Sequence, residues 1–163
     1  MIKELLYELG FVGQFLVSLL LGLLIGLERE LHDKPAGMRT YSLIAAASTA
    51  LVLLGFEIVE VFSGHFDDQL IRADPVRVIQ AIIVGISFVG AGSILKDPET
   101  NAIQNLTTAA SILAVAAMGI AVALSKYYFA VSITIIILII NWILMFPEKW
   151  IRNKAGIKRK RKK

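Results

Sequence analysis

The sequence has no cysteine, only two histidines and few charges, which make up 18% of its 163 residues. Without cysteine there is no disulfide, thiolate metal ligand or sulfur nucleophile, so redox and zinc–cysteine chemistry are excluded. Neither histidine stands in a nucleophile–base pair or a metal triad, and the sequence contains no phosphate-binding loop. We therefore do not expect an enzyme, and we expect no bound cofactor.

Apolar residues dominate instead, with 56% hydrophobic residues and a mean hydropathy of +0.71. Five apolar runs each approach the roughly 20 residues that cross a bilayer as a helix. They cover residues 9–27, 41–59, 76–95, 106–124 and 128–146. The sequence therefore predicts an all-α membrane protein, a polytopic bundle of about five transmembrane helices. One domain takes residues 1–148, and a basic tail takes residues 149–163.

Lysine and arginine are divided unequally between the two ends of these runs. If the N-terminus lies outside, 13 of the 17 basic residues fall on the inner side, most of them in the tail. Basic residues near helix ends are retained in the cytoplasm, so we expect the N-terminus outside and the C-terminus inside. The tail is expected to contact anionic lipids. It has no aromatic residues in its last six positions for base stacking, so nucleic-acid binding is not expected.

Small residues recur at helical spacing in the first, third and fourth runs. Such positions let helices approach closely in lipid, either within one chain or against a partner, including a second copy. In the third run, an unwound stretch lining a cavity is the alternative. The fifth run is bulky on every side and is expected to face lipid, with Asn141 as its strongest polar group. The candidate close-packing glycines are Gly22, Gly26, Gly85, Gly90 and Gly92.

Charged residues gather where the first apolar run ends and the second begins. A charged side chain at a helix end costs little free energy if it reaches the membrane interface. One interpretation is therefore that the charged residues here are cytoplasmic anchors, namely Glu28, Arg29 and Arg39. Acidic residues contribute little to retention, however, so Glu28 and Asp97 invite a functional interpretation. Carboxylate oxygens suit Mg²⁺, which makes this ion a candidate ligand or substrate, although no metal site is defined.

The third and fourth runs add further polar groups near their ends. Pro75 is a good helix start, and Arg77 and Gln80 then share one face in the outer leaflet. Asn105 is expected to cap the fourth helix, with Thr108 in its first turn. We take the following residues together as the candidate functional cluster, for a cation or a partner: Glu28, Arg29, Arg39, Arg77, Gln80, Asp97 and Thr108.

The order "GLERE…AGMRT…RVIQAIIVGISFVGAGSIL…NLTTAAS" resembles the membrane domain of the MgtC/SapB family of bacterial inner-membrane proteins. The resemblance covers about residues 22–119. This chain differs from the family pattern at Asn105, where the family often has glycine, and in its basic tail, where longer members carry a soluble domain. The matching positions are Glu28, Arg29, Gly37, Arg39, Thr40, Arg77, Gln80, Gly85, Phe88, Gly90, Ala91, Gly92, Leu106, Thr108, Ala109 and Ala110.

The resemblance implies a prokaryotic inner-membrane protein linked to growth in low magnesium. Members are regarded as regulators that bind other membrane proteins, the F-type ATP synthase among them, or as transporters of magnesium or another cation. A transporter needs a polar path, whereas the residues between the outer Arg77 and the inner Glu28 offer only glycine, serine and threonine. We therefore favour a regulator. Transport along backbone carbonyls, or through an oligomer, is the alternative.

Overall fold

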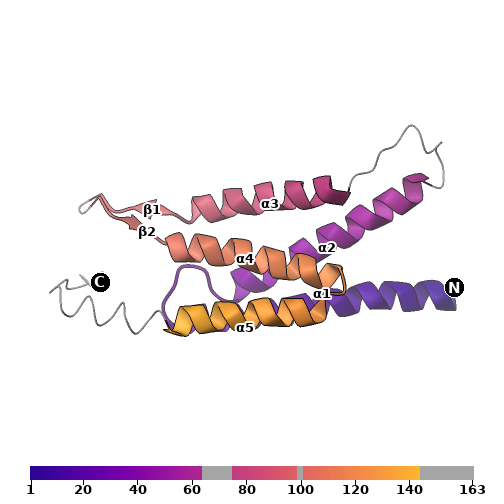
Figure 1. Ribbon diagram of the computed structural model, residues 1–163, viewed down its shortest axis with the longest axis horizontal. Coiled ribbons are helices and arrows are strands. Elements are labelled where there is room, and N and C mark those ends of the chain that lie inside the picture. Colours follow the sequence, from indigo (N-terminus) through magenta and orange to yellow (C-terminus); the bar gives the residue numbers. More distant parts are fainter. Residues whose placement is uncertain (64–74, 99–100, 144–163) are drawn as a thin grey trace.

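The computed structural model describes residues 1–63, 75–98 and 101–143. Within these residues, five helices lie lengthwise beside one another, and a short antiparallel hairpin joins the third to the fourth (Figure 1). This arrangement confirms the predicted all-α bundle. In chain order the elements are α1 (Ile2–Leu31), α2 (Met38–Ser63), α3 (Pro75–Gly92), β1 (Leu95–Lys96), β2 (Ile103–Gln104), α4 (Leu106–Ala123) and α5 (Tyr127–Ile143).

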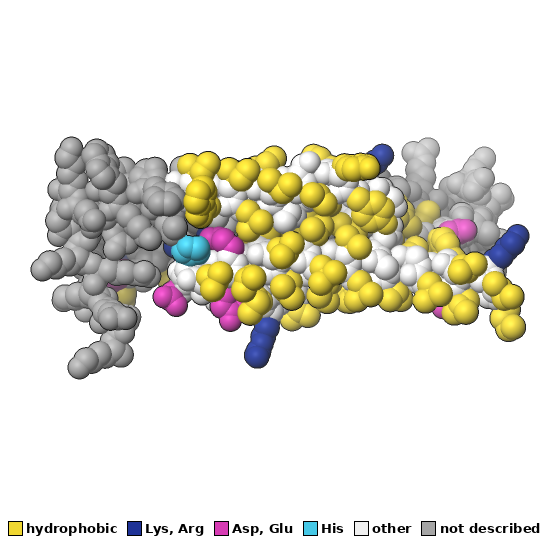
Figure 2. Space-filling model, turned by 90° about the horizontal axis from the view of Figure 1, so that it is seen from below, with side chains coloured by type: hydrophobic (Ala, Val, Ile, Leu, Met, Phe, Trp, Pro, Cys, Tyr) yellow, Lys and Arg dark blue, Asp and Glu magenta, His cyan; other side chains and the backbone are white. Residues whose placement is uncertain are grey.

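The surface of the bundle is that of a protein that crosses a membrane several times. By length and composition, α1, α2 and α4 can each cross a bilayer, and α3 and α5 are shorter apolar helices. Hydrophobic side chains cover the middle of the face shown in Figure 2, and charged side chains lie mainly toward its two ends. On α5, most side chains are exposed, and the buried Ala130, Thr134 and Ile137 form one stripe toward the bundle.

Helix α4 lies at the centre, in contact with each of the other four helices. Its small side chains allow this, since a Cβ at Gly119 would collide with the backbone oxygen of Ala45 on α2. At the same crossing, the Thr49 hydroxyl of α2 donates to the Gly119 carbonyl oxygen at 2.8 Å. Small residues and interhelical hydrogen bonds are what hold helices together in lipid.

Several elements differ from the apolar runs that predicted them. Helix α1 continues beyond its run at both ends, because Glu4 and Glu28 are compatible with helix although they are not apolar. The third run was expected to stay helical to residue 95, but α3 ends at Gly92, and β1 begins at Leu95. The predicted basic tail and the last residues of the fifth run lie outside the described residues.

Candidate functional site

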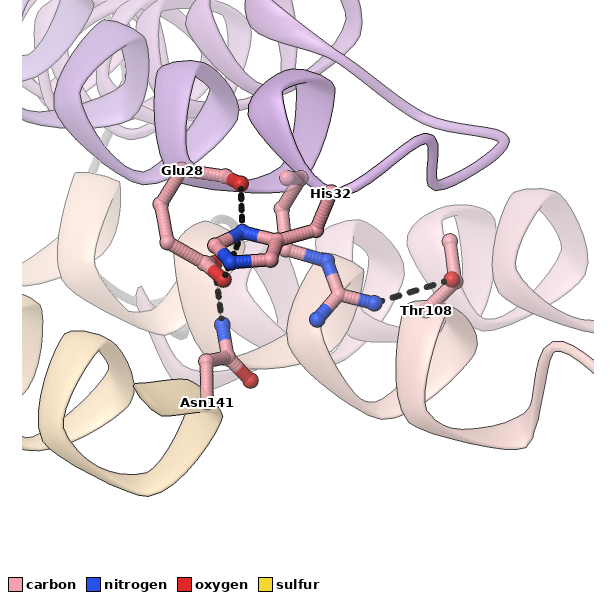
Figure 3. Close-up of polar contacts among 5 residues, drawn as sticks. Glu28, His32, Thr108 and Asn141 are labelled. Atoms are coloured by element: carbon pink, nitrogen blue, oxygen red, sulfur yellow. Dashed lines mark hydrogen bonds and ion pairs between the residues drawn. The ribbon is translucent and has the colours of Figure 1, made fainter. Parts of the chain in front are cut away.

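A polar cluster lies at the end of the bundle where α1 and α5 end and α4 begins. Figure 3 shows side chains of α1 reaching toward Thr108 of α4 on one side and Asn141 of α5 on the other. The sequence pattern explains the location, since a helix end is where a charged side chain costs least in a membrane. Three of the predicted cluster residues meet here: Glu28, Arg29 and Thr108.

Arg29 is buried, with 3% of its surface exposed. Its Nη2 donates to the Thr108 hydroxyl at 3.3 Å, and its Nε has no hydrogen-bond partner within the part of the chain that the structure describes. No carboxylate of the described residues forms an ion pair with it. It stands in the last turn of α1, where the partial negative charge of the helix end favours a cation. The guanidinium is therefore held by a hydroxyl and a helix end rather than by an acid.

Tyr41 completes the surroundings of Thr108. It belongs to the first turn of α2, is fully buried, and points its hydroxyl at the Thr108 carbonyl oxygen, 3.5 Å away. The start of α2 comes this close because α1 carries glycine opposite it, at Gly22 and Gly26. A Cβ at Gly22 would lie 2.6 Å from the Tyr41 carbonyl oxygen. The two glycines thus position the tyrosine.

Glu28 points toward α5 rather than α4. Its Oε2 accepts a hydrogen bond of 2.9 Å from Asn141 Nδ2, and its Oε1 lies 3.2 Å from His32 Nδ1. The same His32 nitrogen lies 2.7 Å from the Glu28 carbonyl oxygen (Figure 3). Both carboxylate oxygens are therefore engaged by neighbouring side chains.

Glu30 joins α1 to a third helix. Its Oε2 accepts a hydrogen bond of 2.9 Å from the backbone N–H of Met38, the first residue of α2, and this satisfies one donor that the helix start leaves open. Three consecutive residues of α1 therefore contact three helices: Glu28 reaches α5, Arg29 reaches α4 and Glu30 reaches α2. This row of contacts, the Glu28–Glu30 row, is the main structural feature of the site.

The structure places the other predicted cluster residues elsewhere. Arg39 is exposed in the first turn of α2, and Asp97 lies in the hairpin, where its Oδ2 accepts a hydrogen bond from Gln104. Arg77 and Gln80 are exposed near the start of α3, at the opposite end of that helix from the hairpin. Among the described residues, no group of three or more acidic or histidine side chains is placed to hold a metal ion.

Sequence reasoning did not assign roles to the three further members His32, Tyr41 and Asn141. Asn141 carried a usable signal, because a lone amide in an apolar helix needs a partner in lipid. Asn105 does occupy the residue before α4, as expected, but it makes no side-chain cap. Its Nδ2 donates to the Ser93 carbonyl oxygen instead, with the Asn105 backbone in the left-handed region at a φ of 68°.

The five candidate close-packing glycines fall into two groups. Gly22 and Gly26 face backbone atoms of the α1–α2 crossing, and Gly90 is in ordinary contact with Ala109 of α4. A Cβ at Gly85 or Gly92 would meet no atom within 4 Å in the described part of the chain. Among the described residues, these two glycines lie on the side of α3 that faces away from its neighbours, so their role in close packing stays a prediction, for a partner.

Comparison with known proteins gives consistent matches. Residues 15–150 match the MgtC family. An uncharacterized protein of Haemophilus influenzae is 37% identical over 90% of this chain and 60% of its own length. Protein SapB of Bacillus subtilis is 35% identical over 86% of this chain and 57% of its own, and protein MgtC of Salmonella typhimurium is 30% identical over 87% and 55%. This chain therefore spans 55–60% of the length of these relatives. No solved structure matches it.

Proposed function

Because the chain belongs to the MgtC family, we propose that it supports growth in low magnesium by binding and regulating another membrane protein. The observation that carries this proposal is the open face of α3. Gly85 and Gly92 share this face with Val84 and Phe88, whose surfaces are 70% and 82% exposed. Small residues beside a protruding aromatic ring fit the groove and ridge of a partner helix.

The position of α3 in the bundle leaves this face free for a partner. The helix packs on α4 and α2 with its other side, through Ile82 and Gly90. The resemblance to the family includes Gly85, Phe88 and Gly92, three residues that lie away from the packed side of α3 in the described part of the chain. An F-type ATP synthase or a second copy of the chain is the kind of helical membrane partner that we propose.

The buried Arg29 argues against a path for cations through a single chain. A buried positive charge that no carboxylate of the described residues pairs with, at one end of the bundle, repels a passing cation. Along the helices, buried hydroxyls of Ser111 and Thr134 donate back to carbonyl oxygens of their own helices. Their hydrogen bonds stay within one helix, and among the described residues no acidic side chain accompanies them along the helices to hold a cation, which supports a regulator over a transporter.

A magnesium or other cation transporter is the second candidate function. Its support is Ser48, which is fully buried on α2 beside Gly119 of α4 and whose Oγ has no hydrogen-bond partner among the described residues. An unpaired hydroxyl beside a glycine is the kind of oxygen that lines an ion path when another copy supplies the remaining wall.

The regulator proposal is tested by placing a bulky side chain on the open face. Gly85→Leu and Gly92→Leu should each abolish complementation of a deletion strain in low magnesium, with the protein still inserted in normal amount. Gly13→Leu on α1 is the matched control, because its Cβ also meets no atom within 4 Å, and it should complement fully. Growth of both α3 variants at the wild-type rate would refute the assignment of this face.

Flux measurement separates the two functions. Purified protein in liposomes with an enclosed Mg²⁺ indicator should give no flux above that of empty vesicles, while a known carrier does. If the wild-type chain carries Mg²⁺ and Glu28→Gln does not, the transporter is correct and its path passes the Glu28–Glu30 row.

We also propose an orientation in a prokaryotic inner membrane, with the N-terminus outside and the tail on anionic lipids of the cytoplasmic leaflet. Lys34, Arg39 and Lys96 support it, because they are exposed near the helix ends on the side of the polar cluster. The chain lacks cysteine, so a single introduced cysteine reports on which side of the membrane its position lies. Asp33→Cys should be protected from a membrane-impermeant maleimide in intact cells, and Lys126→Cys should react.

A further inference from the structure

Helices α1 and α2 are in tight contact at one end and diverge toward the other (Figure 1). Gly22 and Gly26 bring them together near the polar cluster, whereas a Cβ at Gly10 or Gly13 would meet no atom of the described residues within 4 Å. Between the diverging halves lies a groove of about 660 Å³. This volume is in the range of small-molecule sites, about 300–1,000 Å³, and far above what one ion or water needs.

The deep part of the groove is apolar. Phe11, Val12 and Phe15 line it from α1, and Leu53 and Leu54 line it from α2. The lining runs along α1 from Glu4 to Phe15. At a rise of about 1.5 Å per residue this is about 17 Å, close to half of the roughly 30 Å hydrocarbon core. The groove therefore matches one acyl chain within one leaflet.

The end of the groove next to the α1 N-terminus is acidic. Glu4, Glu8 and Glu57 belong to its lining, and no lysine or arginine of the described residues does. Glu4 forms an ion pair with the amino group of Met1 at 2.6 Å, so Glu8 and Glu57 are left to define the charge of the opening. Tyr7, which interacts with Glu57, adds a polar group at the same level.

We propose that this groove binds phosphatidylethanolamine, with an acyl chain along the apolar walls and the ammonium group between Glu8 and Glu57. The charge of the opening selects the lipid class. An ammonium is attracted to two carboxylates and donates hydrogen bonds to them, whereas phosphatidylglycerol brings an uncompensated phosphate toward the same carboxylates. The polarity of the groove, acidic at the surface and apolar in depth, matches the order of head and tail in the lipid.

The test uses the full chain reconstituted in vesicles of equal phosphatidylethanolamine and phosphatidylglycerol, released into detergent and weighed by native mass spectrometry. Bound phosphatidylethanolamine should exceed bound phosphatidylglycerol about fivefold, because each partly exposed charge pair is worth a factor of about two to five. Glu8→Gln combined with Glu57→Gln should bring the ratio to about one. The charge-matched control, Asp33→Asn with Asp97→Asn at the other end of the bundle, should keep it.

A second variant tests the apolar part of the groove. Leu54→Trp places a larger side chain in the groove and should lower the total lipid bound per chain. Because Leu54 is exposed, the substitution should leave the unfolding midpoint unchanged. Equal binding of both lipids to the wild-type chain would overturn the proposal, as would a preference that survives in the Glu8 and Glu57 variant. A dimer that Leu54→Trp dissociates would also overturn it, by assigning the groove to a second copy.

Discussion

Glu28 and Asn141 are 113 positions apart in the sequence, yet Glu28 Oε2 accepts a 2.9 Å hydrogen bond from Asn141 Nδ2. The bond joins the end of α1 to the end of α5, a helix that otherwise meets the bundle through one narrow stripe of side chains. A charged acceptor strengthens such a bond, and low surrounding polarity limits competition from water. The docking of α5 therefore depends on a polar contact as well as on apolar packing.

Replacing Asn141 with leucine should lower the free energy of unfolding by about 1–2 kcal/mol, because Glu28 then loses a donor in a partly buried setting. The measurement is an SDS unfolding titration in mixed micelles. Ser132→Ala on the same helix is the control, since Ser132 is exposed and bonds to a carbonyl of its own helix. In a double-mutant cycle with Glu28→Gln, additive effects would contradict a direct bond.

Arg29→Met should raise the free energy of unfolding by about 1–2 kcal/mol, because no carboxylate of the described residues pairs with the buried charge and its burial costs more than one weak hydrogen bond returns. The same variant should fail to complement growth in low magnesium, as expected of a residue retained for function. Arg39→Met is the control for stability, because Arg39 is exposed and should change it by less than about 0.5 kcal/mol. A lower unfolding midpoint for Arg29→Met would show that the guanidinium is a net stabilising group.

Gly26→Ala should destabilise the chain by about 1–3 kcal/mol, since overpacking forces backbone shifts. The new Cβ would lie 2.6 Å from the Cα of Met38, an atom that cannot turn away. Gly13→Ala, on the same helix and free of neighbours, should leave the unfolding midpoint unchanged or raise it. Equal midpoints for the two variants would mean that α1 and α2 do not cross at Gly26.

Thr49→Val keeps the shape of the side chain and removes the hydroxyl that bonds to Gly119 of α4. We expect a loss of about 0.6–1.7 kcal/mol, between the average and the largest value for hydrogen bonds between membrane helices. The SDS titration used for Asn141 measures it, with Ser132→Ala again as the control. If the free energy of unfolding falls no further than in the control, packing alone stabilises this crossing.

The number, order and class of the helices could be predicted from the sequence, because an unbroken apolar run of bilayer length is typical of a transmembrane helix and of little else. The ends could not. Lys96 and Ile103 pair in a hairpin too short for any periodicity, and Glu4 is equally acceptable inside a helix or before it. Apolar runs report hydropathy, and helix ends depend on local hydrogen bonds as well.

The site could be predicted in part. Charges at a helix boundary drew attention to Glu28, Arg29 and Arg39, but the structure groups the first two with Thr108 and leaves Arg39 exposed. These residues differ in the direction in which their side chains point from the helix axis. Successive residues on a helix point about 100° apart, so neighbours in sequence reach different helices, and no pattern in one segment says which helix stands in each direction.

The Glu28–Glu30 row couples the positions of the helices that it contacts. One turn of α1 holds α5, α4 and α2 through successive side chains, so a rotation of that turn exchanges all three contacts at once. Packed helix ends have discrete arrangements and resist gradual deformation. At this end of the bundle, a displacement of any one of these helices is therefore transmitted to the others through the same turn of α1, and the three helix ends move together.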